Sequence, residues 1–314
     1  MNIATMSNII KRYGNHIVLD HVNIEIRQGE ILGLLGPNGA GKTTVIHALS
    51  GLIGIDSGNI ELFGERQSGS MLEAKRNIGL VTQDITIFED LTAKENLAFF
   101  GGIYGLSGAV LKRRIVETLH FVGLMDQANK RPTKFSGGMK RRLNIACSII
   151  HRPKLLIMDE PTVGIDPQTR NHILESVLEL QKMGTTILYT THYMEEVQFL
   201  ASRIVIMDQG HVIAQGTIDE LVKNIRHEEK IMLEVVELTE ALLDDIKQLD
   251  GVKHVTLLGT TIQITLQAGT GNLDRILSLA KGAGGVINIH AQKPTLEDVF
   301  LTLTGKQLRD TEGI

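Results

Sequence analysis

One short stretch limits what this chain can fold into more than any other. Residues 36–43 are Gly-Pro-Asn-Gly-Ala-Gly-Lys-Thr; they follow the apolar run 31–35 and precede residues 45–50, which have the spacing of an amphipathic helix. A strand, a glycine loop and a helix in this order, with Lys42 and Thr43 in register, are typical of a phosphate-binding loop. The sequence therefore predicts a nucleoside triphosphate site in which Lys42 reaches the β- and γ-phosphates and Thr43 holds Mg²⁺.

Length and charge set the outer limits. The chain has 314 residues, enough for one large domain or two smaller ones, and we expect two. Its formal net charge of −4 provides no positive field for nucleic acid, so no nucleic-acid partner is expected. The N-terminus lacks a secretory pattern, and no apolar run approaches the roughly 18 residues that span a bilayer. Any role in a membrane process is therefore expected from the aqueous side.

Cysteine and histidine usage argues against a protein-bound transition metal. Cys147 is the single cysteine, and its apolar neighbours, residues 145–150, favour a small buried residue in a reducing compartment over a reactive thiol. The 11 histidines show no paired metal-ligand spacing.

Polar residues follow three apolar runs that are predicted to be strands. Gln83 follows residues 78–81, Asp159 and Glu160 follow residues 155–158, and His192 follows residues 185–190. Because ligands bind at the carboxyl edge of open α/β sheets, we expect these side chains to converge with Lys42 and Thr43 on one site. Adjacent carboxylates at a strand end are costly without a cation or a proton-transfer role, so Asp159 is expected to face Mg²⁺ and Glu160 a water. Glu195 and Glu196, one turn beyond His192, are predicted to be helix-face residues rather than metal ligands.

Other segments keep two interpretations open. Residues 3–26 alternate as an antiparallel hairpin with Tyr13 at the turn, where its ring could stack on a purine or pack on its neighbours. Residues 91–124 change to a helical period, an insertion that extends to about residue 150. Within it, Ser136, Gly137 and Gly138 begin a helix, as either a second anion-binding terminus or a plain cap. Asp166 and Pro167 begin another helix.

In this order the motifs resemble the nucleotide-binding subunits of ABC transporters, and the match runs from about Asn2 to Leu221. The resemblance implies that the phosphate loop is formed by Gly36, Pro37, Asn38, Gly39, Ala40, Gly41, Lys42, Thr43 and Thr44. It further implies an adenine-stacking ring at Tyr13 and a glutamine at Gln83 that touches Mg²⁺ and the transmembrane partner.

The same resemblance implies roles for residues later in the chain. Ser136, Gly137 and Gly138 are similar to the signature that caps the γ-phosphate held by the opposite subunit. Asp159 corresponds to the Mg²⁺-associated carboxylate and Glu160 to the general base. Asp166 resembles the loop aspartate at the dimer interface, and His192 the switch histidine. The signature departs from the common pattern at Phe135 and Met139, where the family usually has Leu and Gln, which affects the fine tuning of the dimer contact.

The chain beyond residue 222 is predicted to be a separate domain. Its apolar runs follow the order β-α-β-β-α-β, which suggests a small ferredoxin-like unit over residues 223–314, with a charged linker around residues 226–230. A nucleotide-binding domain followed by such a tail, with residues 294–300 near its end, is similar to the drug-resistance subfamily of ABC-2-type exporters, which includes the daunorubicin-resistance ATPases. In that subfamily the tail is associated with dimerisation or regulation.

The predicted fold class is therefore α/β: a P-loop NTPase of the ABC type with an antiparallel β subdomain and a helical insertion, then a small α+β domain. The resemblance implies an ATP- and Mg²⁺-dependent ATPase. It would act as a homodimer at the cytoplasmic face of the cell membrane and power export through a separately encoded polytopic permease. The alternatives are a soluble ABC ATPase acting on ribosomes or DNA, an importer ATPase, and a regulatory module that binds ATP without hydrolysing it.

Overall fold

The computed structural model describes residues 1–67, 72–224, 228–259, 261–267, 272–292 and 295–304. These residues divide into two compact units, the first running to Ile218 and the second starting at Asp219. Part of the linker predicted around residues 226–230 lies outside the described residues, as does the start of the 294–300 motif.

The first unit contains an antiparallel sheet built on an N-terminal hairpin. Its strand order is β2-β1-β4-β5, and the bounds are β1 (Asn2–Tyr13), β2 (His16–Arg27), β4 (Ser57–Leu62) and β5 (Glu65–Arg66). The register pairs Ala4 with both Ile26 and Leu62, so the inward-facing residues of three strands meet in one apolar layer. The predicted antiparallel subdomain is thus confirmed.

A six-stranded sheet forms the centre of this unit. Its order is β10-β9-β3-β8-β7-β6, with β3 (Ile31–Leu35), β6 (Ile78–Val81), β7 (Leu155–Asp159), β8 (Thr186–Thr191), β9 (Arg203–Asp208) and β10 (His211–Gly216). Five strands of this sheet, β9, β3, β8, β7 and β6, run parallel, whereas β10 pairs antiparallel to β9. Every residue of β3, β7 and β8 is buried, as expected for parallel strands covered on both faces.

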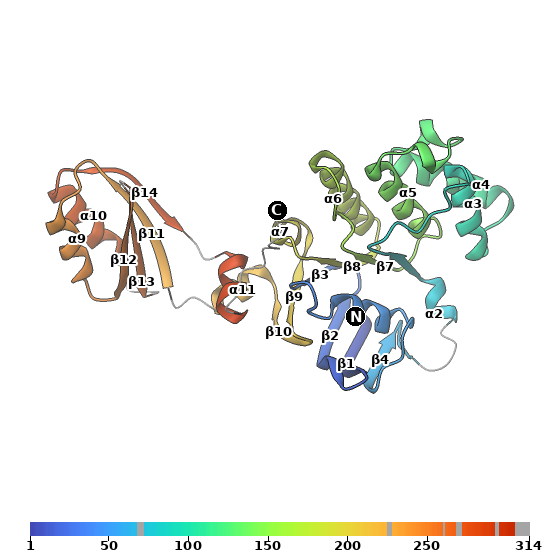
Figure 1. Cartoon of the computed structure of the whole chain (residues 1–314), viewed down its shortest axis with the longest axis horizontal. Coiled ribbons are helices and arrows are strands. Elements are labelled where there is room, and N and C mark those ends of the chain that lie inside the picture. Colours follow the sequence, from blue (N-terminus) through green and yellow to red (C-terminus); the bar gives the residue numbers. More distant parts are fainter. Residues whose placement is uncertain (68–71, 225–227, 260, 268–271, 293–294, 305–314) are drawn as a thin grey trace. The chain divides into compact units, whose positions relative to one another are not determined.

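Different layers cover the two faces of this sheet (Figure 1). One face packs on α1 (Lys42–Leu49) and the antiparallel sheet. The other face packs on the helical insertion and on α6 (Pro167–Lys182). The remaining helical elements of this unit are α2 (Leu72–Arg76), α3 (Ala93–Ile103), α4 (Gly108–Phe121), η1 (Met125–Gln127), η2 (Pro132–Lys134), α5 (Gly137–Ile149) and α7 (Met194–Leu200). Cys147 is buried in this core, as predicted.

The second unit begins within α8 (Ile218–Asn224) and carries its own sheet. The elements are β11 (Glu228–Val235), α9 (Glu240–Lys247), β12 (Val252–Leu258), β13 (Thr261–Gln267), α10 (Leu273–Gly282), β14 (Val286–Gln292) and α11 (Leu296–Thr304). The sheet is antiparallel with the order β12-β13-β11-β14, and its core lies between the central strands and the two helices α9 and α10. This is the predicted β-α-β-β-α-β arrangement.

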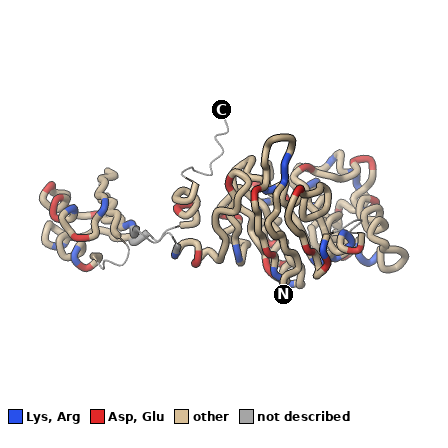
Figure 2. Tube along the Cα trace, turned by 90° about the horizontal axis from the view of Figure 1, so that it is seen from below, with Lys and Arg blue, Asp and Glu red and all other residues tan. Residues whose placement is uncertain are grey.

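Positive and negative residues are interspersed along the trace of the first unit (Figure 2). Within the part of the chain that the structure describes, no helix combines the length and the apolar character needed to cross a membrane. The described residues also include no group of three or more His, Cys, Asp or Glu side chains placed to hold a metal ion by themselves.

Candidate active site

The phosphate loop connects β3 to α1, and its glycines are required by the backbone. Gly39 and Gly41 have φ angles of +81° and +101°, a region that side chains with a Cβ rarely adopt. At Gly36 a Cβ would lie 2.5 Å from the carbonyl oxygen of Met207 on β9. The loop therefore folds tightly against the sheet, and Lys42 becomes the first residue of α1.

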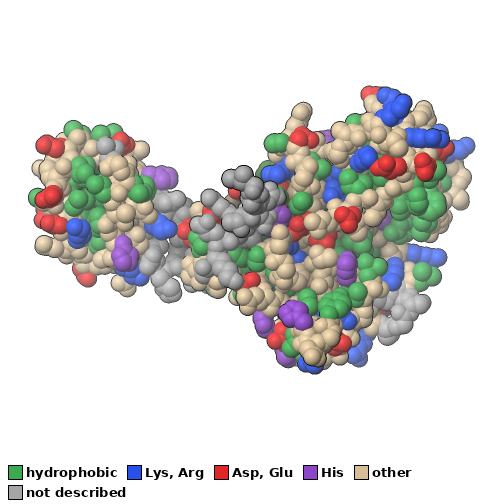
Figure 3. Space-filling model, viewed as in Figure 1, with side chains coloured by type: hydrophobic (Ala, Val, Ile, Leu, Met, Phe, Trp, Pro, Cys, Tyr) green, Lys and Arg blue, Asp and Glu red, His purple; other side chains and the backbone are tan. Residues whose placement is uncertain are grey.

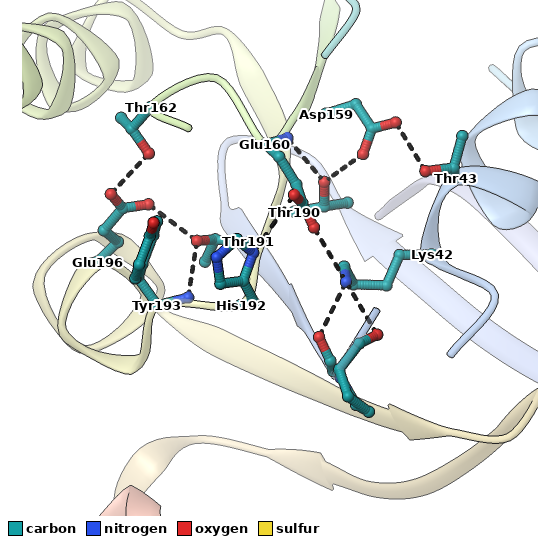
Figure 4. Close-up of polar contacts among 12 residues, drawn as sticks. Lys42, Thr43, Asp159, Glu160, Thr162, Thr190, Thr191, His192, Tyr193 and Glu196 are labelled. Atoms are coloured by element: carbon teal, nitrogen blue, oxygen red, sulfur yellow. Dashed lines mark hydrogen bonds and ion pairs between the residues drawn. The ribbon is translucent and has the colours of Figure 1, made fainter. Parts of the chain in front are cut away.

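Lys42 points back across its own loop (Figure 4). Its Nζ donates to the carbonyl oxygens of Gly36 at 2.8 Å and Pro37 at 3.2 Å, and lies 3.0 Å from Oε1 of Glu160. The side chain is only 5% exposed, so these three acceptors replace the water that would otherwise solvate the ammonium.

Thr43 and Asp159 lie together beside this cluster. The Thr43 hydroxyl donates to Oδ2 of Asp159 at 2.9 Å, while Thr190 on β8 donates to Oδ1 at 2.7 Å. A hydroxyl and a carboxylate side by side form the hard oxygen donor set that Mg²⁺ prefers, with the remaining ligands usually supplied by phosphate and water. The donor chemistry of this pair fits Mg²⁺.

Glu160 sits at the turn that follows β7. Its φ is +45°, which is uncommon for a residue with a side chain, and its N–H donates to both the carbonyl oxygen and the hydroxyl of Thr190. His192 Nδ1 lies 3.3 Å from Oε2 of Glu160, and both side chains are less than 10% exposed. Burial raises the pKa of Glu160, but the contacts with His192 and Lys42 outweigh it and lower the pKa to about 2.

The structure therefore gathers five of the predicted residues at the carboxyl ends of the strands and leaves others exposed. Tyr13 ends β1 with half its surface exposed and Lys11 Nζ 5.2 Å from its ring centre. Gln83 is exposed just after β6, and its carbonyl accepts from Arg141. Ser136 caps α5 by accepting from the Met139 N–H.

Asp166 and the signature glycines are also placed by local geometry. Asp166 caps α6 and accepts from the Thr169 N–H at 2.9 Å, and it is exposed. A Cβ at Gly138 would lie 2.7 Å from the Thr169 hydroxyl, whereas one at Gly137 would meet nothing within 4 Å. Gly138 is thus needed for packing on α6, and Gly137 leaves the helix terminus open.

Residues 19–163 match the sequence family described as ABC transporter. The linearmycin resistance ATP-binding protein LnrL of Bacillus subtilis (strain 168) is 46% identical over 96% of this chain and 98% of its own length. The daunorubicin resistance ATP-binding protein DrrA2 of Streptomyces coeruleorubidus is 37% identical over 96% of this chain and 95% of its own length. The chain belongs to the ATP-binding subunits of ABC transporters.

Solved structures support the assignment of this chain to the ATP-binding subunits of ABC transporters. A structure of an ATP-binding subunit of an ABC transporter is 31% identical, with a TM-score of 0.66 over 71% of this chain and 92% of that one. A dimeric ATP-binding cassette in a post-hydrolysis state, bound to ADP and Pi, is 27% identical, with a TM-score of 0.62 over 68% of this chain and 98% of that one. The ABC subunit is therefore an ATPase, and the predicted family, fold class and drug-resistance exporter subfamily are confirmed.

The sequence did not reveal that one residue near the site is buried. Glu195 and Glu196 both lie on α7, as predicted, but Glu195 is exposed and Glu196 is only 2% exposed. The signal was available in the spacing of Val197 and Leu200, which put residues 196, 197 and 200 on the inner face of the helix.

Proposed function

We propose that this ABC subunit works as a homodimer that holds two ATP molecules between its subunits. In each site, Lys42 and Thr43 bind the phosphates from one subunit, while Ser136 and Gly137 of the other subunit cap the γ-phosphate. The buried cluster of Lys42, Glu160 and His192 beside the Thr43–Asp159 pair supports this proposal. Such a cluster places a cation, a base and a metal-type donor set at one strand edge.

In the proposed reaction, Glu160 takes a proton from water as the water oxygen bonds to the γ-phosphorus. The bond between the γ-phosphorus and the bridging oxygen breaks, which leaves ADP and inorganic phosphate. Lys42 and His192 stabilise the negative charge that develops on the transferred group. Thr43 and Asp159 would hold Mg²⁺, with Gln83 as a further proposed ligand, and the ion would neutralise charge on the phosphates.

The contacts of Lys42 explain why Glu160 is a weak base when no nucleotide is bound. With Lys42 and His192 against it, Glu160 has a pKa of about 2 and is a weak base. Phosphate oxygens attract the ammonium more strongly than the carbonyls of Gly36 and Pro37 do, because hydrogen bonds between charged groups are the stronger ones. When Lys42 turns to the phosphates, Glu160 loses one of the contacts that lower its pKa and becomes free to accept a hydrogen bond from water, while the contact with His192 remains.

The exposed predicted residues fit the edges of such a site. Tyr13 would stack on adenine, and its exposed ring is available for this. Gly137 leaves space in front of the α5 terminus, where the Ser136 hydroxyl and free N–H groups could meet a phosphate from the opposite subunit. Asp166, exposed at the start of α6, would lie at the dimer interface. The second unit would add to dimerisation or regulation.

An exposed apolar patch marks where the membrane partner would dock. The patch consists of Ile85, Phe88, Phe99 and Ile103, which follow Gln83 or lie on α3, and each is at least 36% exposed. Figure 3 shows apolar side chains gathered on this side of the first unit. The rings of Phe88 and Phe99 pack edge to face with centroids 4.8 Å apart. Exposed aromatic clusters of this kind are typical of interaction sites.

We propose that this partner is a separately encoded polytopic permease and that the subunit works at the cytoplasmic face of the membrane. The direction of transport is export. Relatives named for resistance to linearmycin and daunorubicin support an antibiotic or another secreted compound as the cargo.

The test is affinity purification of Glu160→Gln with Mg·ATP from detergent-solubilised membranes, with bound proteins identified by mass spectrometry. A multi-span membrane protein should be recovered, and a Phe99→Ser change should reduce its recovery while leaving ATP binding intact. Phe199→Ser is the matched control, because Phe199 is a similarly exposed phenylalanine on α7. Recovery of ribosomes, or of the protein alone, would contradict the proposal that the partner is a membrane permease.

A further inference from the structure

We propose that Glu196 is a positioning residue for hydrolysis, a buried carboxylate that fixes His192 and the loop after Glu160 relative to each other. The inference rests on the proposed roles of Glu160 and His192. Glu196 itself touches neither of the groups that would meet ATP, and it acts through hydroxyls on the neighbouring segments.

Glu196 accepts three hydrogen bonds from hydroxyl groups on two separate parts of the chain. Thr162 donates to Oε1 at 2.6 Å, and Tyr189 and Thr191 each donate to Oε2 at 2.9 Å. All three donors are at most 1% exposed. Arg170 of α6 completes the surroundings, with its Nε 3.6 Å from Oε1.

These contacts bracket His192 on both sides. Thr191 precedes the histidine and donates to Glu196, and the same Thr191 hydroxyl accepts from the backbone N–H of Tyr193 at 2.9 Å. Both neighbours of His192 are thereby linked to one carboxylate (Figure 4). Because a ring at the end of a strand is aimed by the backbone on either side of it, fixing these neighbours fixes the imidazole relative to Glu160.

The Thr162 contact extends the same control to the other catalytic segment. Thr162 lies two residues after Glu160 and four before Asp166, in the connection between β7 and α6. Glu160 is held in an uncommon backbone conformation, and such conformations persist only where the surroundings over-determine them. Glu196 supplies one of those constraints through its hydrogen bond with Thr162.

The Glu196 carboxylate is suited to this role because donor groups surround both of its oxygens. Burial, followed by the charge of Glu196, raises the pKa of Tyr189 well above its usual value, so the phenol stays protonated and remains a donor. A glutamine has one acceptor oxygen and one donor group in the same space. It would therefore present N–H to at least one of the hydroxyls and leave Arg170 without its negative partner.

The experiment compares Glu196→Gln with Glu195→Gln, an exposed neighbour on the same helix, and with wild type. ATP binding is titrated with a fluorescent ATP analogue, and kcat is expressed per subunit that binds the analogue. We expect kcat of Glu196→Gln to fall at least about tenfold with analogue affinity within about twofold of wild type, since misplaced groups lower turnover more than ground-state binding. Glu195→Gln should match wild type.

A second arm separates positioning from general destabilisation. Glu196→Gln is combined with His192→Ala, and adding Glu196→Gln to His192→Ala should cost much less than it costs in wild type, because effects of residues that act as a unit are not additive and only the part exerted through Thr162 remains. Thr191→Val, which keeps the shape and removes the hydroxyl, should reproduce part of the loss. The proposal is overturned if kcat per binding subunit is unchanged in Glu196→Gln, or if the two losses multiply. Glu160→Gln runs in parallel, so that a failure of the base assignment is seen independently of Glu196.

Discussion

Two buried carboxylates in the first unit differ in what surrounds them. Glu160 is 6% exposed and faces two side chains, Lys42 and His192, both from segments expected to bind phosphate. Glu196 is 2% exposed and faces three hydroxyls and Arg170, none of which is expected to touch ATP. A ligand can therefore compete for the partners of the first carboxylate but not for those of the second.

The difference shows how the site combines a movable part with a fixed one. The Lys42–Glu160 pair is exchangeable, because phosphate oxygens can take the ammonium and leave the carboxylate to a water. The hydroxyls around Glu196 are buried and donate to a carboxylate that no expected ATP contact reaches, so nucleotide binding does not compete for them. We infer that stability resides in the second cluster and reactivity in the first.

Removing the exchangeable cation should have a large effect on ATP binding. Lys42→Met should weaken ATP binding by about tenfold or more, since a hydrogen bond to a charged group contributes about 1.5–3 kcal/mol and 1.4 kcal/mol corresponds to tenfold. Calorimetric titration with ATP measures this. Lys154→Met is the control, because Lys154 precedes β7 at the end of the strand opposite Asp159. Unchanged ATP affinity in Lys42→Met would remove Lys42 from the site.

The free energy of unfolding should also separate the two carboxylates. Glu196→Gln should lower the free energy of unfolding by about 2–3 kcal/mol, because a buried hydroxyl and Arg170 lose their acceptor. Glu160→Gln should lower it by less than that, because the amide loses the charge that Lys42 and His192 stabilise, while its oxygen still accepts and Lys42 keeps two carbonyl partners. Urea unfolding followed by circular dichroism is suitable, because the chain has no Trp. Equal losses in the two variants would mean that the carboxylates are equivalent.

The pKa of Glu160 also predicts a pH dependence of stability that is specific to this residue. Its folded-state pKa of about 2 lies below the usual 4.5, so its ionised form stabilises the nucleotide-free protein fully above pH 4.5. That contribution is lost as the pH falls from 4.5 toward 2. Wild type should therefore lose stability more steeply than Glu160→Gln across this interval, as measured by unfolding midpoints at several pH values. Parallel curves would show that Lys42 and His192 do not hold the charge on Glu160.

The sequence predicted the parts of the site that have a local pattern. The loop before Lys42 needs glycines at fixed positions, and the polar residues after β7 and β8 follow uninterrupted apolar runs, so Asp159, Glu160 and His192 could be placed at one edge. Parallel pairing of β3, β7 and β8 then brings them together. The strand order of both sheets in this unit required the structure.

The partners of Glu196 could not be predicted in the same way. Thr162 is 34 residues away from it along the chain, and Arg170 lies on a different helix. Hydroxyl and guanidinium groups at such separations meet only when α6, α7 and β8 have packed. An acidic residue in the first turn of a short helix usually lies on the surface, where it complements the helix dipole. Tertiary packing overrides that preference here.

Steady-state hydrolysis and ATP binding in Glu160→Gln decide whether Glu160 is the base for ATP hydrolysis. We predict that ATP binds with affinity within about threefold of wild type while kcat falls at least about a hundredfold, because general-base catalysis contributes about 10²–10⁴. A kcat close to that of wild type in this variant would contradict the claim.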